Sequence, residues 1–213
     1  MQDLLIQAFW ETLVMVGASA GIAVALGLPI ALLLRVTDRD GLSPRPWINK
    51  PIGVIVNAAR STPFIILMVA IVPFTRFVAG TSIGTGAAIV PLALAATAFL
   101  ARLFENALHE VDKGVIEAAR AMGATRMQIV LKVLVPEALP GIIAATTVAL
   151  VSLVGFSAMA GAIGGGGLGD LGIRFGYQRF MPEVMATVVI LLIVFVQGLQ
   201  SLGDWLVRRV SHR

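Results

Sequence analysis

The sequence predicts an all-α integral membrane protein with five transmembrane helices, and three observations lead to this fold class. The chain of 213 residues is 58% hydrophobic and only 13% charged, whereas soluble domains carry about 25% charged residues. It contains five apolar segments long enough to cross a bilayer core of about 30 Å as helices. Its lysines and arginines are concentrated in the loops that would lie on one side of the membrane, as the positive-inside rule requires.

The five apolar segments are predicted to form a single membrane domain over residues 1–213. The expected spans are residues 13–34, 52–73, 86–103, 141–163 and 184–206. No stretch outside them is long and polar enough for a second, soluble domain. The sequence shows no tandem repeat and no second half of an inverted-repeat transporter. We therefore expect another copy of the chain to supply the rest of a pathway, as a two-fold homodimer.

Prolines mark the expected ends of these spans and two expected kinks. Four of them lie near span ends, where proline favours the start or the end of a helix: Pro51, Pro136, Pro140 and Pro182. Pro29 and Pro63 lie inside spans and are expected to kink them, which membrane helices tolerate.

The charge distribution predicts that the N-terminus lies outside and the C-terminus inside. In this orientation the external side holds only Arg76, Arg174 and Arg179 of the 16 basic residues. The cytoplasmic side then holds Arg35, Arg39, Arg45, Lys50, Arg60, Arg102, Lys113, Arg120, Arg126, Lys132, Arg208, Arg209 and Arg213. The opposite orientation would reverse this bias and is excluded on that ground.

The longest cytoplasmic connection, residues 104–139, is predicted to contain two short helices separated by a hinge at Gly123. Asp112 is the expected N-cap of the first, and the pair Thr125 and Gln128 is a capping box for the second. Four apolar residues of the first helix fall on one face at helical spacing: Val115, Ala118, Ala119 and Met122. Pro136 and Pro140 are expected to close the second helix and start the next span. The apolar face is expected either to meet a partner or to pack on the chain itself.

Several energy sources and kinds of site are excluded by residue types that the sequence lacks. There is no cysteine, and His109 and His212 are far apart, so neither a thiolate nor a histidine metal site is expected. There is no G-x-x-x-x-G-K-[ST] motif for ATP, and no acidic residue near the middle of a span for ion coupling. Residues 161–170 form a glycine-rich run, which we interpret as a flexible helix end, an external gate or a partner-docking surface. The driving energy is therefore expected to come from outside this chain.

The segment from Glu117-Ala118-Ala119 to Gly123, followed by Ile129, Pro136 and Pro140, resembles the EAA loop of ABC importer permeases. This resemblance implies that the loop couples the permease to a separate ATPase through Val115, Glu117, Ala118, Ala119, Met122 and Gly123. It also implies that ATP and Mg²⁺ are bound by the ATPase subunit. The chain itself would then have no catalytic, cofactor-binding or metal-binding residues and would not be an enzyme.

Residues 57–67 with 71–76, and residues 156–169, resemble the corresponding segments of methionine importer permeases. The similarity extends over nearly the whole chain. The resemblance implies a type I ABC importer permease fold in a bacterial inner membrane. Its implied partners are a second copy, two ATPase subunits and an extracytoplasmic binding protein, with no nucleic acid. The implied function is ATP-driven uptake of D- or L-methionine.

The candidate substrate path is predicted from residue chemistry. A path for methionine needs an apolar, polarisable lining, and Phe156, Met159 and Ser157 suit it. Asn57 and Ser61 are candidates for the inner vestibule. Each of these residues has an alternative interpretation in helix packing or in satisfying backbone groups.

Two alternatives to methionine import remain open at this point. The first keeps the ABC class and changes the cargo to another small amino acid, a dipeptide or an osmolyte. The second is a non-energised channel or a structural membrane subunit, whose behaviour would not depend on ATP or on an ATPase partner.

Overall fold

The structure is a computed structural model that describes residues 2–211, and all regular secondary structure in these residues is helical. Arg213 and His212, which entered the charge and metal-site arguments, lie outside the described residues. The first half of the chain contains α1 (Gln2–Thr37), α2 (Pro46–Ser61), α3 (Phe64–Ala70), α4 (Val72–Ala79) and α5 (Thr85–His109). The second half contains α6 (Lys113–Ala121), α7 (Arg126–Ile129), η1 (Val130–Leu134), α8 (Val135–Ala160), η2 (Gly161–Gly165), α9 (Gly167–Leu171), η3 (Gly172–Tyr177) and α10 (Pro182–Val210).

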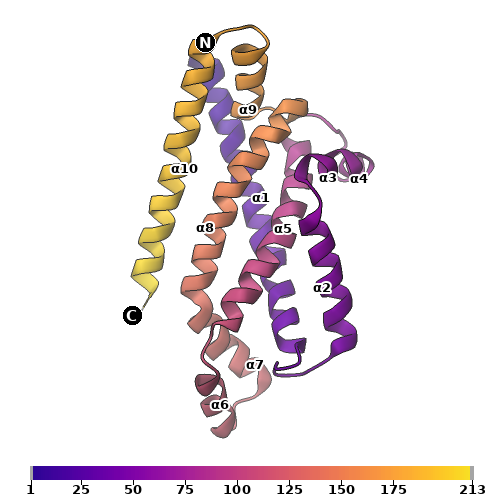
Figure 1. Cartoon of the computed structure of the whole chain (residues 1–213), viewed down its shortest axis with the longest axis vertical. Coiled ribbons are helices and arrows are strands. Elements are labelled where there is room, and N and C mark those ends of the chain that lie inside the picture. Colours follow the sequence, from indigo (N-terminus) through magenta and orange to yellow (C-terminus); the bar gives the residue numbers. More distant parts are fainter. Residues whose placement is uncertain (1, 212–213) are drawn as a thin grey trace.

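The core of the bundle is the packing of α1, α5 and α8, which run side by side along its long axis (Figure 1). Small residues let these helices approach closely, as is common in membrane bundles. A Cβ atom on Gly27 of α1 would lie only 3.3 Å from the backbone nitrogen of Ala101 in α5. Larger side chains fill the space between such contacts, among them the fully buried Met15, Leu100 and Phe104. This packing supplies a rigid centre on which the peripheral elements rest.

Four helical stretches of the described chain are long and apolar enough to cross a membrane, and they become five if one bent helix pair is counted as a single broken span. The bent pair is α2 and α3, whose axes differ by 105°. The sequence predicted one kinked span over residues 52–73, but Pro63 breaks the helix completely. Thr62 adopts an extended conformation with φ −79° and ψ 126°, because a residue before proline is driven out of the helical region. After the break, α3 and α4 lie across the bundle (Figure 1).

Pro136 and Pro140 do not close a helix, contrary to the sequence prediction. The chain continues from α7 through the π-helical turn η1 into α8, so that residues 126–165 form one long span. The π-helical turn lengthens the hydrogen-bond spacing by one residue. This relieves the clash between the ring of Pro136 and the carbonyl one turn earlier, which would end an ordinary helix.

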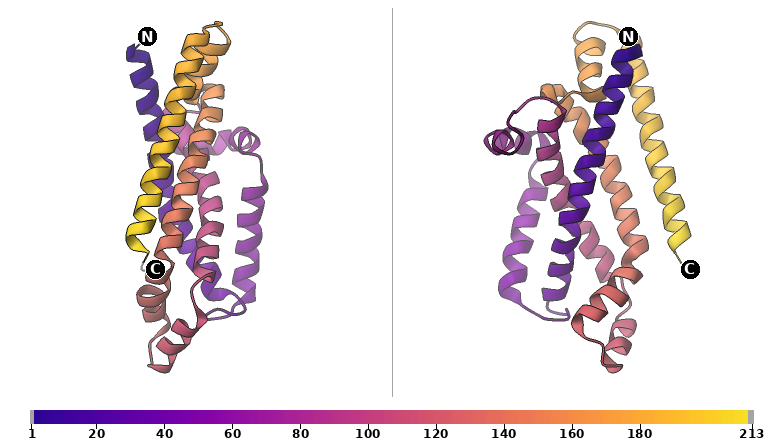
Figure 2. Two further views of the ribbon diagram at one scale, coloured as in Figure 1. Left: turned by 60° about the vertical axis from the view of Figure 1, so that its left-hand side comes forward. Right: turned by 180° about the vertical axis from the view of Figure 1, so that it is seen from behind.

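The two ends of the bundle carry different structures, which Figure 2 shows from two sides. The short helices α6 and α7 project at one end, and α10 runs towards it. The N-terminal end of α1 lies at the other end, together with α9. The helix α10 stands at the edge, and only 11% of the residues in its most apolar 18-residue stretch are buried. Most of its surface is therefore left for lipid, water or a partner.

Candidate functional sites

The connection between α5 and α8 has the capped two-helix structure that its sequence predicts. The carboxylate of Asp112 accepts a hydrogen bond from the backbone N–H of Gly114 and caps α6. Thr125 and Gln128 form both bonds of a capping box at the start of α7. Both caps that the local sequence predicts are therefore present in the structure.

Gly123 ends α6 in a left-handed conformation, with φ +80°. Its N–H donates to the carbonyl of Arg120 at 2.9 Å, and the N–H of Ala124 donates to the carbonyl of Ala119 at 3.1 Å. These two bonds are those of a Schellman motif, which strongly favours glycine at this position. The predicted hinge is therefore a fixed turn that sets the angle between α6 and α7.

The face of α6 that points away from the protein carries three of the four predicted apolar residues. Val115, Ala118 and Met122 are exposed, and Met122 is 83% exposed. Ala119 was predicted on the same face, but it is 4% exposed and belongs with Ile116 to the buried core. The reason is that residues three apart share a helix face, so Ala119 follows the larger Ile116 inward. Glu117 and Gly123 are exposed beside the apolar residues.

The connection between α1 and α2, residues 38–45, braces both short helices. Asp40 Oδ2 lies 3.4 Å from the Nζ atom of Lys113 at the start of α6. Arg126, the first residue of α7, donates a hydrogen bond to the hydroxyl of Ser43 at 2.9 Å. Sequence reasoning missed these contacts, because the partners are 73 and 83 residues apart and polar connections carry no pairing signal.

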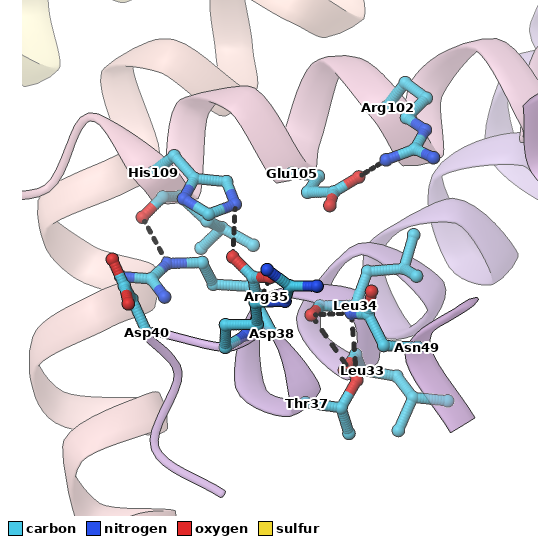
Figure 3. Close-up of polar contacts among 12 residues, drawn as sticks. Leu33, Leu34, Arg35, Thr37, Asp38, Asp40, Asn49, Arg102, Glu105 and His109 are labelled. Carbon is cyan, nitrogen blue, oxygen red and sulfur yellow. Dashed lines mark hydrogen bonds and ion pairs between the residues drawn. The ribbon is translucent and has the colours of Figure 1, made fainter. Parts of the chain in front are cut away.

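Arg35 is buried where α1 meets α5 and α6, whereas the sequence predicted only that its charge helps to set the orientation in the membrane. It is 5% exposed, and its Nε atom donates to the carbonyl of Leu108 at 3.3 Å. Figure 3 shows it beside Asp38, whose carboxylate lies 3.6 Å from His109. Arg35 also lines a small cleft of ≈ 70 Å³ together with Glu117 and other charged residues. The predicted coupling residue Glu117 is thus in one cleft with the end of α1.

The predicted substrate-path residues on α8 do not share one environment. The ring of Phe156 stacks on Phe64 of α3 with centroids 4.8 Å apart. Met159 is 47% exposed. Ser157 is 2% exposed, and its hydroxyl donates to the carbonyl of Val154 in its own helix. Met159 is therefore accessible, whereas Ser157 points into the core and does not line an open path.

Asn57 and Ser61 take part in local contacts at the surface of α2. The Oδ1 atom of Asn57 accepts a hydrogen bond from Nε of Arg102 at 3.0 Å, which links α2 to α5. Arg102 also donates to the carbonyl of Gly53 and pairs with Glu105. The hydroxyl of Ser61 donates to the carbonyl of Asn57. Both predicted vestibule residues remain exposed, so their structural contacts leave room for a second role.

The glycine-rich run forms an ordered structure, since η2 and α9 occupy it. Glu11 of α1 accepts a hydrogen bond from the N–H of Gly167 at 2.7 Å, and Thr12 accepts one from Leu168 at 2.9 Å. A Cβ atom on Gly169 would overlap with the backbone of Ala158. The glycines therefore allow close packing and are held by polar side chains of α1.

Among residues 2–211, no three His, Cys, Asp or Glu side chains lie close enough together to hold a metal ion.

Comparisons with known proteins agree on one family. The family model of the binding-protein-dependent transport system inner membrane component matches residues 23–213. The probable D-methionine transport system permease protein MetI of Vibrio cholerae is 53% identical over 211 residues, covering 99% of this chain and 94% of the relative. The D-methionine transport system permease protein MetI of Escherichia coli K12 is 52% identical over 161 residues, covering 76% of this chain and 74% of the relative.

Solved structures share the architecture along the whole chain. A chain of an inward-facing structure of the MetNI methionine ABC transporter has a TM-score of 0.97 and 50% identity, covering 100% of this chain and 98% of that chain. A chain from the crystal structure of an amino acid ABC transporter with histidines has a TM-score of 0.81 at 22% identity, covering 98% of this chain and 94% of that chain. The latter likeness concerns the fold alone.

Proposed function

This chain belongs to the family of binding-protein-dependent transport system inner membrane components, and on that premise we propose that it is the permease subunit of an ATP-driven methionine importer. The family places it in the inner membrane as a multi-pass protein. The cargo is proposed from relatives named as D-methionine permeases, which reach 53% identity. The likeness to a methionine ABC transporter chain, with a TM-score of 0.97, supports the same cargo.

The single observation that carries the proposal is the structure of α6. Its ends are fixed by Asp112 and Gly123, and one side is anchored by Ile116 and Ala119. The outward side presents Val115, Ala118 and Met122 next to the exposed Glu117. A short, rigid helix with an unpartnered apolar face is suited to dock another subunit and to transmit its movement to the bundle. We propose that this face is the docking surface for the ATPase.

We further propose that α6 and α7 lie on the cytoplasmic side, as the distribution of basic residues requires. In this arrangement the ATPase subunit binds ATP and Mg²⁺, and the permease has no catalytic step of its own. Two copies of this chain and two ATPase subunits form the complex. An extracytoplasmic binding protein delivers the cargo to the end that carries α9.

The residues proposed for the outer part of the path are Met159 and Phe156. Met159 is accessible, and its thioether is a suitable contact for an apolar, polarisable cargo. Phe156 and Phe64 form a stacked pair between α8 and α3. Such a pair closes a gap between two elements without any charged group. Asn57 and Ser61 are proposed for the inner vestibule.

Reconstitution tests the proposal. The chain is co-expressed with its ATPase subunit, purified and placed in liposomes with the binding protein and radiolabelled methionine. We expect uptake that requires ATP and that unlabelled methionine suppresses. Suppression by another amino acid but not by methionine would change the cargo and keep the class. Uptake without ATP, or failure to co-purify with a P-loop subunit, would exclude the ABC class.

A further inference from the structure

A cavity between α8 and α10 lies outside the sites described so far. Its volume is ≈ 250 Å³, which is room for about eight water molecules at liquid density. Nine residues line it, and four of them are polar: Thr147 and Ser152 of α8, and Gln200 and Asp204 of α10. The remaining walls are mostly apolar. Four polar side chains gathered between two membrane-spanning helices require a physical reason.

Asp204 is the most informative residue of this cavity. It is exposed, and among residues 2–211 no cation lies within ion-pair distance of its carboxylate. Arg208 follows one turn later in the same helix but does not pair with it. An ionised side chain in a membrane helix is costly when it faces lipid, so such residues face water or a binding partner. Asp204 lines the cavity, so its carboxylate is placed where a cationic group could bind it.

The polar character extends along α10 towards the middle of the bundle. Gln197, Gln200 and Asp204 are separated by three and four residues and thus lie on one face. Gln197 is about 20 Å from the end of α10 and Asp204 about 9 Å, at 1.5 Å per residue. This polar face therefore reaches from the inner end of the helix well into the apolar region.

The α8 wall of the cavity continues directly to the proposed outer path. Val148, Ser152, Gly155 and Met159 are spaced three or four residues apart, so they share one face of α8. Three of them are exposed and Ser152 is half-buried. This face of α8 therefore carries Met159 near the glycine-rich end of the bundle. It lines the cavity nearer the opposite end of the bundle, where α6 lies. A single continuous surface connects the two.

Close helix packing fixes the position of the cavity. Gly203 of α10 is buried against Thr147 of α8, and a Cβ atom at this glycine would overlap with the threonine side chain. The hydroxyls of Thr147 and Ser152 donate to carbonyls of their own helix. Their oxygens can therefore only accept further hydrogen bonds from a ligand. The cavity thus has two hydroxyl acceptors, one amide and one carboxylate at fixed places.

We propose that this cavity is a binding station for the amino-acid cargo in the inner half of the path, with Asp204 holding the α-ammonium group. The pairing is a charge-assisted hydrogen bond, which is stronger than one between neutral groups. The amide N–H of Gln200 donates to the cargo carboxylate. Val148, Val151 and Val207 contact the thioether side chain, as apolar walls do in small-molecule sites. This assignment rests on the proposed function, because it takes an amino acid as the cargo.

The first test is uptake by the reconstituted complex with Asp204→Asn. Loss of one charged hydrogen bond raises the KM for methionine about tenfold. The competitor 4-(methylthio)butanoate, which lacks the ammonium group, distinguishes this loss from a general defect. In the wild type its inhibition constant for methionine uptake is far higher than that of unlabelled methionine. In the variant the two inhibition constants differ only about twofold. The control Ser201→Ala lies between Gln200 and Asp204 but does not line the cavity, and it behaves as the wild type.

A second test remains informative if Asp204→Asn does not fold. The chain has no cysteine, so Ser152→Cys introduces a single, nearly isosteric probe. A charged, membrane-impermeant methanethiosulfonate modifies it in the whole complex, and methionine slows the reaction at least threefold. Leu202→Cys is the matched control, because Leu202 is 54% exposed on the opposite face of α10, and it reacts slowly with or without methionine.

The outcomes separate the two proposals. No ATP-dependent methionine uptake by the wild type overturns the proposed function and this inference with it. Wild-type uptake with an unchanged KM and unchanged discrimination in Asp204→Asn overturns the inference alone, as does labelling of Ser152→Cys that methionine does not slow. A disulfide between two copies of Ser152→Cys identifies the face as a contact between subunits and also overturns it.

Discussion

The carboxylate of Glu11 accepts a hydrogen bond from the backbone N–H of Gly167, 156 residues further along the chain, at 2.7 Å. The other carboxylate oxygen accepts from the side-chain amide of Gln7 at 2.9 Å. One residue of α1 therefore holds the start of α9, which would otherwise present unbonded N–H groups at its first turn.

Substituting Glu11→Ala is expected to loosen α9 without unfolding the bundle. A hydrogen bond to a charged group contributes about 1.5–3 kcal/mol, and here it acts on a short peripheral helix. Hydrogen exchange at the amides of Gly167 and Leu168 should accelerate by tenfold or more. The variant Glu11→Gln keeps an acceptor and should show a smaller change. Equal exchange in Glu11→Ala and wild type would mean that the bond does not hold α9.

Substituting Gly123→Ala is expected to destabilise the turn between α6 and α7. A residue with a Cβ atom costs about 1–2 kcal/mol in the left-handed region, and Gly123 has φ +80°. Gly123→Pro should be worse, because it also removes the N–H that bonds Arg120. We expect methionine uptake per ATP hydrolysed to fall in both variants. Gly198→Ala is the control, since its added Cβ meets no atom within 4 Å; a coupling ratio in Gly123→Pro equal to this control would contradict the assignment.

Substituting Glu117→Lys is expected to abolish coupling while leaving stability unchanged. The side chain is exposed on α6, and surface substitutions of this kind usually change stability by less than about 0.5 kcal/mol. Reversing the charge at a docking surface should weaken the contact with the ATPase. Comparing Tm with methionine uptake separates the two effects. The variant Glu110→Lys makes the same charge change just outside α6 and should transport normally; wild-type uptake by Glu117→Lys would refute the role.

Substituting Arg102→Met is expected to destabilise the contact between α2 and α5. It leaves the carboxylate of Glu105, which is only 8% exposed, without its partner, and removal of one member of a buried pair costs about 3–5 kcal/mol. It also removes the bonds to Asn57 and Gly53. We expect a clearly lower Tm in detergent. The double variant Arg102→Met with Glu105→Leu should recover part of it, and a single variant as stable as the double one would show that the pair is unimportant.

The sequence predicted those features of the chain that depend on neighbouring residues. The N-cap at Asp112 and the capping box at Thr125 are local, and both were confirmed. The break at Gly123 also lies where it was predicted, but it is a fixed turn and not a hinge. The resemblance to the importer family was also confirmed by the comparisons. Proline was less informative, because its effect depends on what precedes it. Pro63 breaks a span, whereas Pro136 follows a π-helical turn and continues one.

The orientation of residues in α8 could not be predicted in the same way. The helix is apolar almost all round, so hydropathy does not indicate which side is buried. Ser157 was predicted to line the path, yet it points into the core, whereas Ser152 five residues earlier lines a cavity. The cleft shared by Arg35 and Glu117 was missed because its residues meet only through the tertiary fold.

The break at Pro63 has a consequence for the lipids that surround the protein. A helix the length of α2, with 16 residues, reaches about 24 Å, which is less than the bilayer core of about 30 Å. The transverse α3 and α4 follow it and present exposed side chains such as Ile66, Val69 and Phe77. Acyl chains next to this side of the protein therefore meet a shorter apolar wall than those next to α1 or α10. The resulting hydrophobic mismatch favours shorter acyl chains, or a locally thinner bilayer, next to this side of the protein.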